Sequence, residues 1–368
     1  MEQDKRNKKF NTCIISPSGN LYGSEQVLID FLKGSSESYL VFCPSNSILY
    51  DVLRKDAKQH TFKVFCNYIE LYSQVFFLLL YKRIRTVYVN EGGHIRYVKL
   101  LATLFPSNMF YVHIRIIEDT LKSRLKELRC NVKLISVSRF IQDKLQSEGY
   151  SSTLIYDLYE SNNENGDMSS FSKSYLNLIN IGFIGRITNS KGLPKIQLLI
   201  EHINKNYPNK FHFHFFGDID SNEHAALDCI SNISILENVK VTFHGFVKAK
   251  DKIYSKMNVV VHLSTIEALG RIFFEALDFK TYFIGYNQGG IGEIASALGL
   301  SRYMINDNST WKEEFCSKII NLIDKDVRAV ELYINAANIM KNKFSTENYV
   351  SSLEFLLLNN ENFIHRSA

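Results

Sequence analysis

The sequence of 368 residues lacks the features that mark several protein classes. Its six cysteines are scattered without a Cys-x-x-Cys pair, which argues against structural zinc and predicts reduced thiols in a reducing compartment. The first ten residues, MEQDKRNKKF, contain no apolar segment, so we expect neither a signal peptide nor a membrane anchor. The longest apolar run, Val75 to Tyr81, is far shorter than the roughly 20 residues that span a bilayer and predicts a buried helix. These absences predict a globular cytoplasmic protein.

Several familiar site motifs are also missing. The chain has no G-x-G-x-x-G after its first predicted strand, no G-x-x-x-x-G-K-[ST], no G-x-S-x-G and no H-E-x-x-H. The sequence therefore lacks the motifs that would identify a dinucleotide oxidoreductase, a P-loop NTPase, an α/β-hydrolase or a zincin. His212 and His214 lie two apart in one predicted strand, but the phenylalanines around them favour a packed strand over a metal site.

The pattern of apolar residues predicts an α/β protein with two Rossmann-like domains. The chain is long enough for two cores, and 45% hydrophobic with 13% aromatic residues excludes a disordered chain. Short apolar runs alternate with segments of helical period, as in parallel sheets covered by helices. The predicted strands are 12–16, 39–42, 62–65, 86–89, 109–114 and 133–137, then 178–185, 211–217, 239–245, 258–264 and 281–286. The predicted parts are 1–160, a polar linker 161–176, 177–344 and a C-terminal helix within 345–368 that packs back on the first domain.

Charge is unevenly distributed along the chain. Residues 1–156 contain 22 basic and 14 acidic residues, a net of +8, whereas residues 177–368 contain 20 of each. Basic residues cluster in YKRIR (81–85) and in LKSRLKELRCNVK (121–133), the second of which predicts a basic helical face. The first half therefore suits an anionic partner, either a membrane surface or a phosphate-bearing acceptor, and solvated helix faces are the alternative.

The loop after the first strand of the second half carries two cations. In IGFIGRITNSKGLPK, the strand ends at Gly185, Arg186 and Lys191 stand five apart, and Pro194 follows near the first turn of a predicted helix. An arginine grips phosphate oxygens with a planar fork, and a lysine adds a mobile point charge. The loop suits a diphosphate, although a solvated loop would carry the same residues often.

Two glutamates follow about eighty residues later, in STIEALGRIFFEALDF. Glu267 lies at a strand end, and Glu275 lies eight residues on, in a helix that we expect to begin at Ala268. The free amides of a helix N-terminus bind phosphate, and a carboxylate can accept both hydroxyls of a ribose. Eight residues turn a helix by roughly 80° beyond two full turns, so spacing alone leaves open whether the two glutamates share a ligand or are ordinary surface residues.

The combination of these motifs resembles a known family. GFIGRITNSKG, then FHGF (243–246), then Glu-x7-Glu, then NQGGIGEI occur in the order found in the retaining glycosyltransferases of family four, which have the GT-B fold. In the first half, SPSGNLYGSE resembles the family's Gly-Gly-x-Glu loop, with Tyr22 at a position where glycine is common. YVHIRIIED resembles its strand-end histidine, but the acidic residue that often follows is replaced by Ile114 and Arg115.

The resemblance implies a set of site residues. The catalytic residues would be Arg186, Lys191, Glu267 and His113, and the donor-binding residues would be Gly23, Gly185, Phe246, Ala268, Leu269, Gly270 and Glu275. Arg186 and Lys191 would neutralise a leaving diphosphate, Glu275 would hold the ribose, and Glu267 would contact the hydroxyls of the donor sugar. Family members generally need no metal or other cofactor, so we expect the stretch Asp218 to Asp220 to be an acidic turn.

The implied reaction transfers a sugar from a nucleoside diphosphate to a hydroxyl with retention of configuration, with UDP favoured over GDP. A nucleotide-sugar 2-epimerase on the same fold and a binding protein without turnover are the alternatives. The expected partners are the donor, a glycan or lipid-linked acceptor of a bacterial surface polysaccharide such as lipopolysaccharide, and an anionic membrane surface, but no nucleic acid. We therefore expect a cytoplasmic protein that binds peripherally to the inner membrane face.

Overall fold

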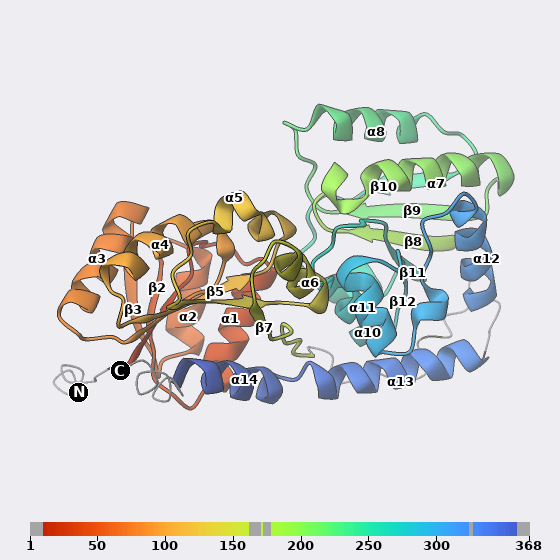
Figure 1. Cartoon of the computed structure of the whole chain (residues 1–368). Coiled ribbons are helices and arrows are strands. Elements are labelled where there is room, and N and C mark those ends of the chain that lie inside the picture. The colour runs from red at the N-terminus through yellow and green to blue at the C-terminus, as the bar shows by residue number, and fades with distance from the viewer. Residues whose placement is uncertain (1–9, 162–170, 172–177, 324–326, 359–368) are drawn as a thin grey trace. The chain divides into compact units, whose positions relative to one another are not determined.

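The computed structural model in Figure 1 describes residues 10–161, 171, 178–323 and 327–358. The chain divides into two compact units. Unit 1 comprises the residues up to Glu160 and from Phe344 onward, and unit 2 runs from Ser161 to Lys343. Most of the predicted linker, 161–176, lies outside the described residues. Within the described ranges, none of the helices combines the length and apolarity needed to cross a bilayer.

Unit 1 is built on a seven-stranded parallel sheet in the order β3-β2-β1-β4-β5-β6-β7. The strands are β1 (Thr12–Ile15), β2 (Leu40–Pro44), β3 (Thr61–Phe65), β4 (Thr86–Val89), β5 (Met109–Ile114), β6 (Val132–Ser136) and β7 (Ser152–Leu154). The six predicted strands are all present. The seventh, β7, was not predicted because it has three residues, two of them polar, and no apolar run.

The helices of unit 1 include one from the end of the chain. They are α1 (Gly23–Gly34), α2 (Ile48–Asp56), α3 (Tyr68–Leu80), α4 (Ile95–Leu104), α5 (Lys122–Leu125), α6 (Arg139–Ser147) and α14 (Thr346–Leu358), with the short turns η2 (Gly92–His94) and η3 (Ile117–Thr120). The ring of Tyr349 on α14 meets that of Phe31 on α1 edge-on at 6.0 Å. Leu353 and Leu357 join the core cluster beneath α1. Burial of these apolar side chains fixes α14 to unit 1.

The N-cap of α1 is Tyr22, whose amide donates to the carboxylate of Glu25. Two local expectations for unit 1 are wrong. The run 75–81 is buried on one side only, since Phe77 is 51% exposed. The basic stretch 121–133 contains only the four-residue helix α5.

Unit 2 has a five-stranded parallel sheet in the order β10-β9-β8-β11-β12. The strands, all predicted, are β8 (Ile179–Ile184), β9 (Phe211–Phe216), β10 (Lys240–Phe243), β11 (Val259–His262) and β12 (Tyr282–Gly285). The helices are α7 (Leu193–Asn206), α8 (His224–Ser234), α9 (Lys250–Tyr254), α10 (Arg271–Asp278), α11 (Gly289–Ala297), α12 (Trp311–Ile323) and α13 (Val327–Lys343), with η5 (Asn189–Lys191) and η6 (Ser301–Tyr303). The helix expected from Ala268 begins three residues later, at Arg271.

Each sheet has one switch point, at which the order of strands reverses. In unit 1 the chain fills one side of β1 with β2 and β3 and returns to place β4 on the other side. In unit 2 it fills one side of β8 with β9 and β10 and returns to place β11 on the other side. Ligands of parallel α/β sheets bind at the carboxyl ends of such strands. The segments after β1, β4, β8 and β11 are therefore the first places to look for a site.

Candidate functional site

The loop after β8 places the two predicted cations differently. Arg186 follows Gly185 directly and is exposed, whereas Lys191 ends η5 and is half-buried. Gly192, with φ of 87°, lies against β11, where a Cβ would come within 2.5 Å of the carbonyl carbon of Leu263. Only glycine permits this approach, and the approach brings Lys191 to the end of β11.

Glu267 is held by two donors at that place. Its Oε2 accepts a hydrogen bond from Lys191 Nζ at 2.8 Å and another from His262 Nε2 at 3.1 Å. Burial alone raises the pKa of Glu267, but the hydrogen bond from His262 and the charge of Lys191 outweigh it and hold the pKa well below its usual range. Glu267 is therefore a fixed carboxylate at the switch point, with its remaining lone pairs open to hydroxyl donors.

Glu275 has its own set of partners. On α10, its Oε1 accepts from Lys250 Nζ at 2.8 Å and its Oε2 accepts from the Tyr254 hydroxyl at 2.9 Å, both from α9. The two predicted glutamates therefore share no partner in the structure. Gly270, with φ of 89°, is the N-cap of α10, and a Cβ there would lie 2.2 Å from Ile291 Cδ1 on α11.

The remaining donor-side residues of unit 2 fall into two groups. Ala268 and Leu269 are buried, and a Cβ on Gly290 of α11 would lie 2.3 Å from the Ala268 carbonyl oxygen. Phe246, after β10, is 72% exposed and so presents a free aromatic face. The N-termini of α10 and α11 thus lie close together beside Glu267, whose carbonyl accepts the amide of Gly290 at 2.8 Å.

Two stretches weighed as metal sites have other contacts. Asp220 Oδ1 accepts the backbone amide of Asn222 at 3.0 Å in a turn. His212 bonds Thr242 at 2.8 Å, and His214 bonds Asn180 and His244 at 3.0 Å each. Over the part of the chain that the structure describes, no group of three or more His, Cys, Asp and Glu side chains could hold a metal ion.

In unit 1, two carboxyl groups meet after β1 and β4. Glu25, two residues after Gly23 in α1, is fully buried, and its Oε2 accepts from the Tyr22 amide and the Ser24 hydroxyl at 3.1 Å each. Burial, together with the hydrogen bond to Glu25 and its charge, raises the pKa of Glu91 to about 8. Glu91 therefore carries a proton at neutral pH.

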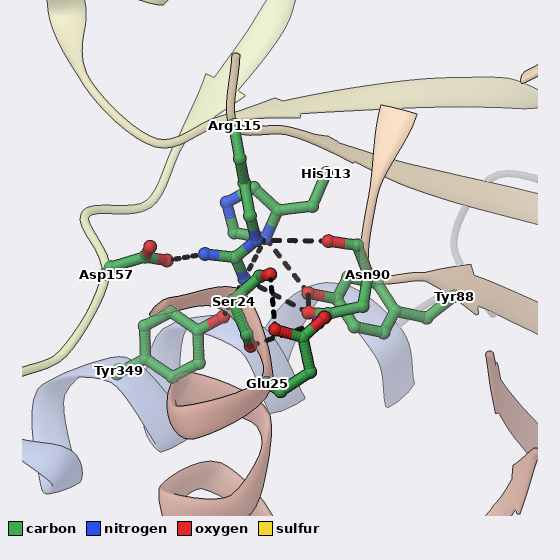
Figure 2. Close-up of polar contacts among 8 residues, drawn as sticks. All are labelled: Ser24, Glu25, Tyr88, Asn90, His113, Arg115, Asp157 and Tyr349. Carbon is green, nitrogen blue, oxygen red and sulfur yellow. Dashed lines mark hydrogen bonds and ion pairs between the residues drawn. The ribbon is translucent and has the colours of Figure 1, made fainter. Parts of the chain in front are cut away.

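The predicted strand-end histidine belongs to a buried network in unit 1. Figure 2 shows Arg115 at its centre, with Asp157 and Tyr349 on one side and His113 and Asn90 on the other. Arg115 pairs with Asp157 and donates to the Asn90 carbonyl at 3.0 Å, to His113 Nδ1 at 3.2 Å and to the Tyr349 hydroxyl at 3.3 Å. Since a guanidinium only donates, Nδ1 of His113 must be the acceptor.

The network determines the state of His113. Burial, then the charge of Arg115, holds the pKa of His113 well below its usual range, so the ring is neutral. His113 has no exposed surface in unit 1. Arg115, which stands near the position of the family's acidic residue, turns inward, so it ties α14 to the sheet instead of facing solvent.

Sequence reasoning missed several residues of these clusters. His262 is hidden in the apolar strand NVVVHLS, where only its place five residues before Glu267 could have identified it. Glu91 follows the strand TVYV by two residues at the switch point, which is a usable signal. Lys250 and Tyr254 lie about twenty residues from Glu275, and nothing in the sequence links them to it.

Comparisons with known proteins agree with this architecture. Residues 169–339 match the family model described as glycosyl transferases group 1. Solved structures with the same fold include HepE of Anabaena, with UDP and glucose bound, at 19% identity and a TM-score of 0.77 over 94% of this chain and 99% of that one. A glycosyltransferase of Rickettsia africae is 16% identical, with a TM-score of 0.73 over 96% and 100%.

A third structure is the lipopolysaccharide outer core galactosyltransferase WaaB, at 11% identity and a TM-score of 0.68 over 94% of this chain and 100% of that one. No curated protein matches the chain in sequence. The family match over residues 169–339 and the shared fold confirm the predicted resemblance to glycosyltransferases and the GT-B fold of two Rossmann-like domains.

Proposed function

We propose that this GT-B glycosyltransferase moves a hexose or N-acetylhexosamine from a nucleoside-diphosphate sugar to a hydroxyl group, with retention of configuration. The observation that carries the proposal is the cluster of Lys191, Glu267 and His262 at the switch point of unit 2. It places a cation for the diphosphate and a fixed carboxylate for sugar hydroxyls side by side, with the N-termini of α10 and α11 next to them.

Negative charge builds on the diphosphate as the bond to the sugar breaks. Arg186 is exposed, so its planar guanidinium can bind two phosphate oxygens. Lys191 has three N–H donors, so it can keep its hydrogen bond to Glu267 while it binds a phosphate oxygen. Donors placed in advance stabilise the departing group without reorganisation. With these cations supplied by the chain, the proposed reaction needs neither a metal nor another cofactor.

Two further residues of unit 2 can supply the other donor contacts. Glu275 accepts two hydrogen bonds and retains lone pairs for the ribose hydroxyls, and the exposed ring of Phe246 suits stacking on a nucleobase. We propose a UDP sugar before a GDP sugar, and the structures of HepE in complex with UDP and with UDP-glucose support this preference.

The proposed acceptor is a glycan or lipid-linked glycan of a bacterial surface polysaccharide. The similarity in fold to WaaB, a lipopolysaccharide outer core galactosyltransferase, supports that class of acceptor. In unit 1, the half-buried Glu91 can form a hydrogen bond with an acceptor hydroxyl, whereas His113 is buried and belongs to the network around Arg115.

The test is donor binding followed by product analysis. A thermal-shift panel of UDP, GDP and their sugars identifies the donor, because a ligand of the folded state raises its melting temperature. Hydrolysis of that donor, followed at once by NMR, should release a sugar with the anomeric configuration of the donor. Lys191→Ala should lower the rate about 100-fold or more, and Lys205→Ala, at the far end of α7, should not.

Each alternative gives a different result in this experiment. A 2-epimerase would return a nucleotide sugar with inverted C2, and a binding protein would bind nucleotide without releasing sugar. Failure of every nucleoside diphosphate to raise the melting temperature would refute the donor assignment itself.

A further inference from the structure

Two neighbouring helices of unit 1 expose large apolar side chains on their outward side. The members of this α3–α4 face are between 50% and 80% exposed: Ile69, Phe77, Leu80, Tyr81, Leu100 and Leu104. On α3 they are Ile69, Phe77 and Leu80, followed by Tyr81 just after the helix. On α4 they are Leu100 and Leu104. This spacing puts them on one side of each helix. A stripe of this kind on the surface of a folded domain marks an interaction site.

The two helices form one continuous surface. The rings of Tyr72 and Tyr97 stack with centroids 4.4 Å apart, and Phe76 meets Phe105 edge-on at 5.3 Å. These contacts join the middle of α3 to both ends of α4, and the ribbons of the two helices are adjacent in Figure 1. The stripe runs from Ile69, near the carboxyl edge of the sheet, to Tyr81 at the opposite edge.

Basic residues flank this face. Lys82, Arg83, Arg85 and Arg96 are all exposed. Between residues 71 and 105 the chain has a single acidic residue, Glu91, which belongs to the carboxyl pair after β4. Within the part of the chain that the structure describes, none of these four cations forms an ion pair. The face thus combines exposed apolar area with uncompensated positive charge.

We propose that the α3–α4 face binds the headgroup region of an anionic lipid bilayer. Apolar side chains on one side of a helix insert into the boundary between headgroups and acyl chains, while basic residues beside them attract anionic lipids. Tyr81, stacked on Phe77 at 6.3 Å, has an apolar body and a polar tip that suit this boundary.

A second copy of the chain fits the same face less well. In a symmetric dimer each patch meets its own equivalent, so the four cations of both copies would surround the contact without acidic partners. Anionic lipids supply the missing opposite charge. Because the face belongs to unit 1, whereas Lys191 and Glu267 belong to unit 2, membrane binding is independent of the proposed donor chemistry.

Co-sedimentation of the full-length protein with vesicles tests the proposal. Vesicles of phosphatidylcholine alone are compared with vesicles that also contain phosphatidylglycerol, at low and at high salt. We expect binding to the anionic vesicles only, weakened by salt. The charge variant Lys82→Gln/Arg83→Gln/Arg85→Gln should lower the partition coefficient about 100-fold.

An apolar variant tests the second component of the face. Ile69→Ser/Phe77→Ser/Leu100→Ser should lose binding at every salt concentration, whereas Leu198→Ser/Ile235→Ser, which removes exposed apolar residues of unit 2, should bind as wild type. Unchanged melting temperatures and unchanged donor hydrolysis would show that the variants are folded and active.

Several results would overturn the proposal. Absence of binding to anionic vesicles at low salt refutes it, as does wild-type binding by the charge variant or by the apolar variant. A dimer in sedimentation equilibrium that the apolar variant dissociates, without vesicle binding, would assign the face to a second copy of the chain instead.

Discussion

The hydrogen bond from His262 to Glu267 leads to a specific kinetic prediction. His262 is 3% exposed at the end of β11, and its Nε2 donates to Glu267 Oε2 at 3.1 Å. His262→Leu keeps an apolar side chain in the strand and removes this donor. A hydrogen bond to a charged group contributes about 1.5 to 3 kcal/mol, so kcat should fall about 10- to 150-fold if the fixed carboxylate acts in the transition state.

The same change should alter the pH profile. Loss of a bond to the charged form raises the pKa of Glu267, by about one unit for each 1.4 kcal/mol. The acid limb of kcat/KM should therefore move to higher pH by about 1 to 2 units. His262→Gln, which can supply an amide N–H, should restore most of the rate and of the profile.

A control variant separates this role from stability. His212→Leu removes another buried histidine of unit 2, which bonds Thr242 at 2.8 Å and has no contact with Glu267. It should change the melting temperature but leave the acid limb in place. A His262→Leu enzyme with wild-type kcat and an unshifted profile would refute the reasoning.

Three further predictions concern binding and stability. Glu275→Ala should weaken binding of UDP about 10-fold or more in calorimetry, and wild-type affinity would exclude the ribose contact. Glu91→Gln should raise the free energy of unfolding at pH 9 by up to about 5 kcal/mol, but should not raise it at pH 4. Burial raises the pKa of Glu91 to about 8, so the folded state loses stability as the pH rises from 4.5 to about 8, and glutamine removes this loss. Equal urea midpoints at pH 9 would contradict this. His212 and His214 have pKa values lowered to about 4 and about 3, chiefly by burial, so the unfolded chain takes up protons first and stability should fall as pH drops from 6.5 toward 4, at up to about 1.4 kcal/mol per unit for each ring. In urea titrations, His214→Asn should flatten this dependence, and an unchanged slope would show that other groups cause it.

The sequence predicted the strands well because each is a local apolar run bounded by polar residues. Eleven predicted strands correspond to strands in the structure. Helix starts were predicted less well, since they depend on side chains that reach back along the chain. The carboxylate of Glu25 accepts the Tyr22 amide at the start of α1. Gly270 is the N-cap of α10, so that helix begins at Arg271 and not at the predicted Ala268.

The candidate site was predicted only in part, because its contacts join distant segments. Arg186, Lys191 and Glu267 could be identified from their motifs, but the bond between Lys191 and Glu267 spans 76 residues and depends on Gly192 lying against Leu263. Periodicity indicates which side of a strand is buried, but it does not indicate which distant residue a side chain contacts. For the same reason His262 could not be distinguished from an ordinary core residue.

Part of the positive charge of the first half is paired inside the fold, which weakens the prediction made from its composition. Arg115 is neutralised by Asp157, Arg124 pairs with Asp119, and Lys99 Nζ donates to the carbonyls of Arg124 and Lys126 at 3.2 and 3.1 Å. A count of basic residues therefore overstates the charge that can attract a membrane.

The difference between these cations gives a final prediction. Lys99→Gln should leave vesicle binding within about 2-fold of wild type, whereas Arg83→Gln should lower the partition coefficient about 5-fold, which corresponds to about 1 kcal/mol per basic residue near the surface. The reason is that Lys99 already satisfies two carbonyls at the end of α5, so its charge is less available to lipid. Lys99→Gln should instead lower the melting temperature. Equal losses of vesicle binding in both variants would mean that binding follows total charge, and the local assignment to the α3–α4 face would then fail.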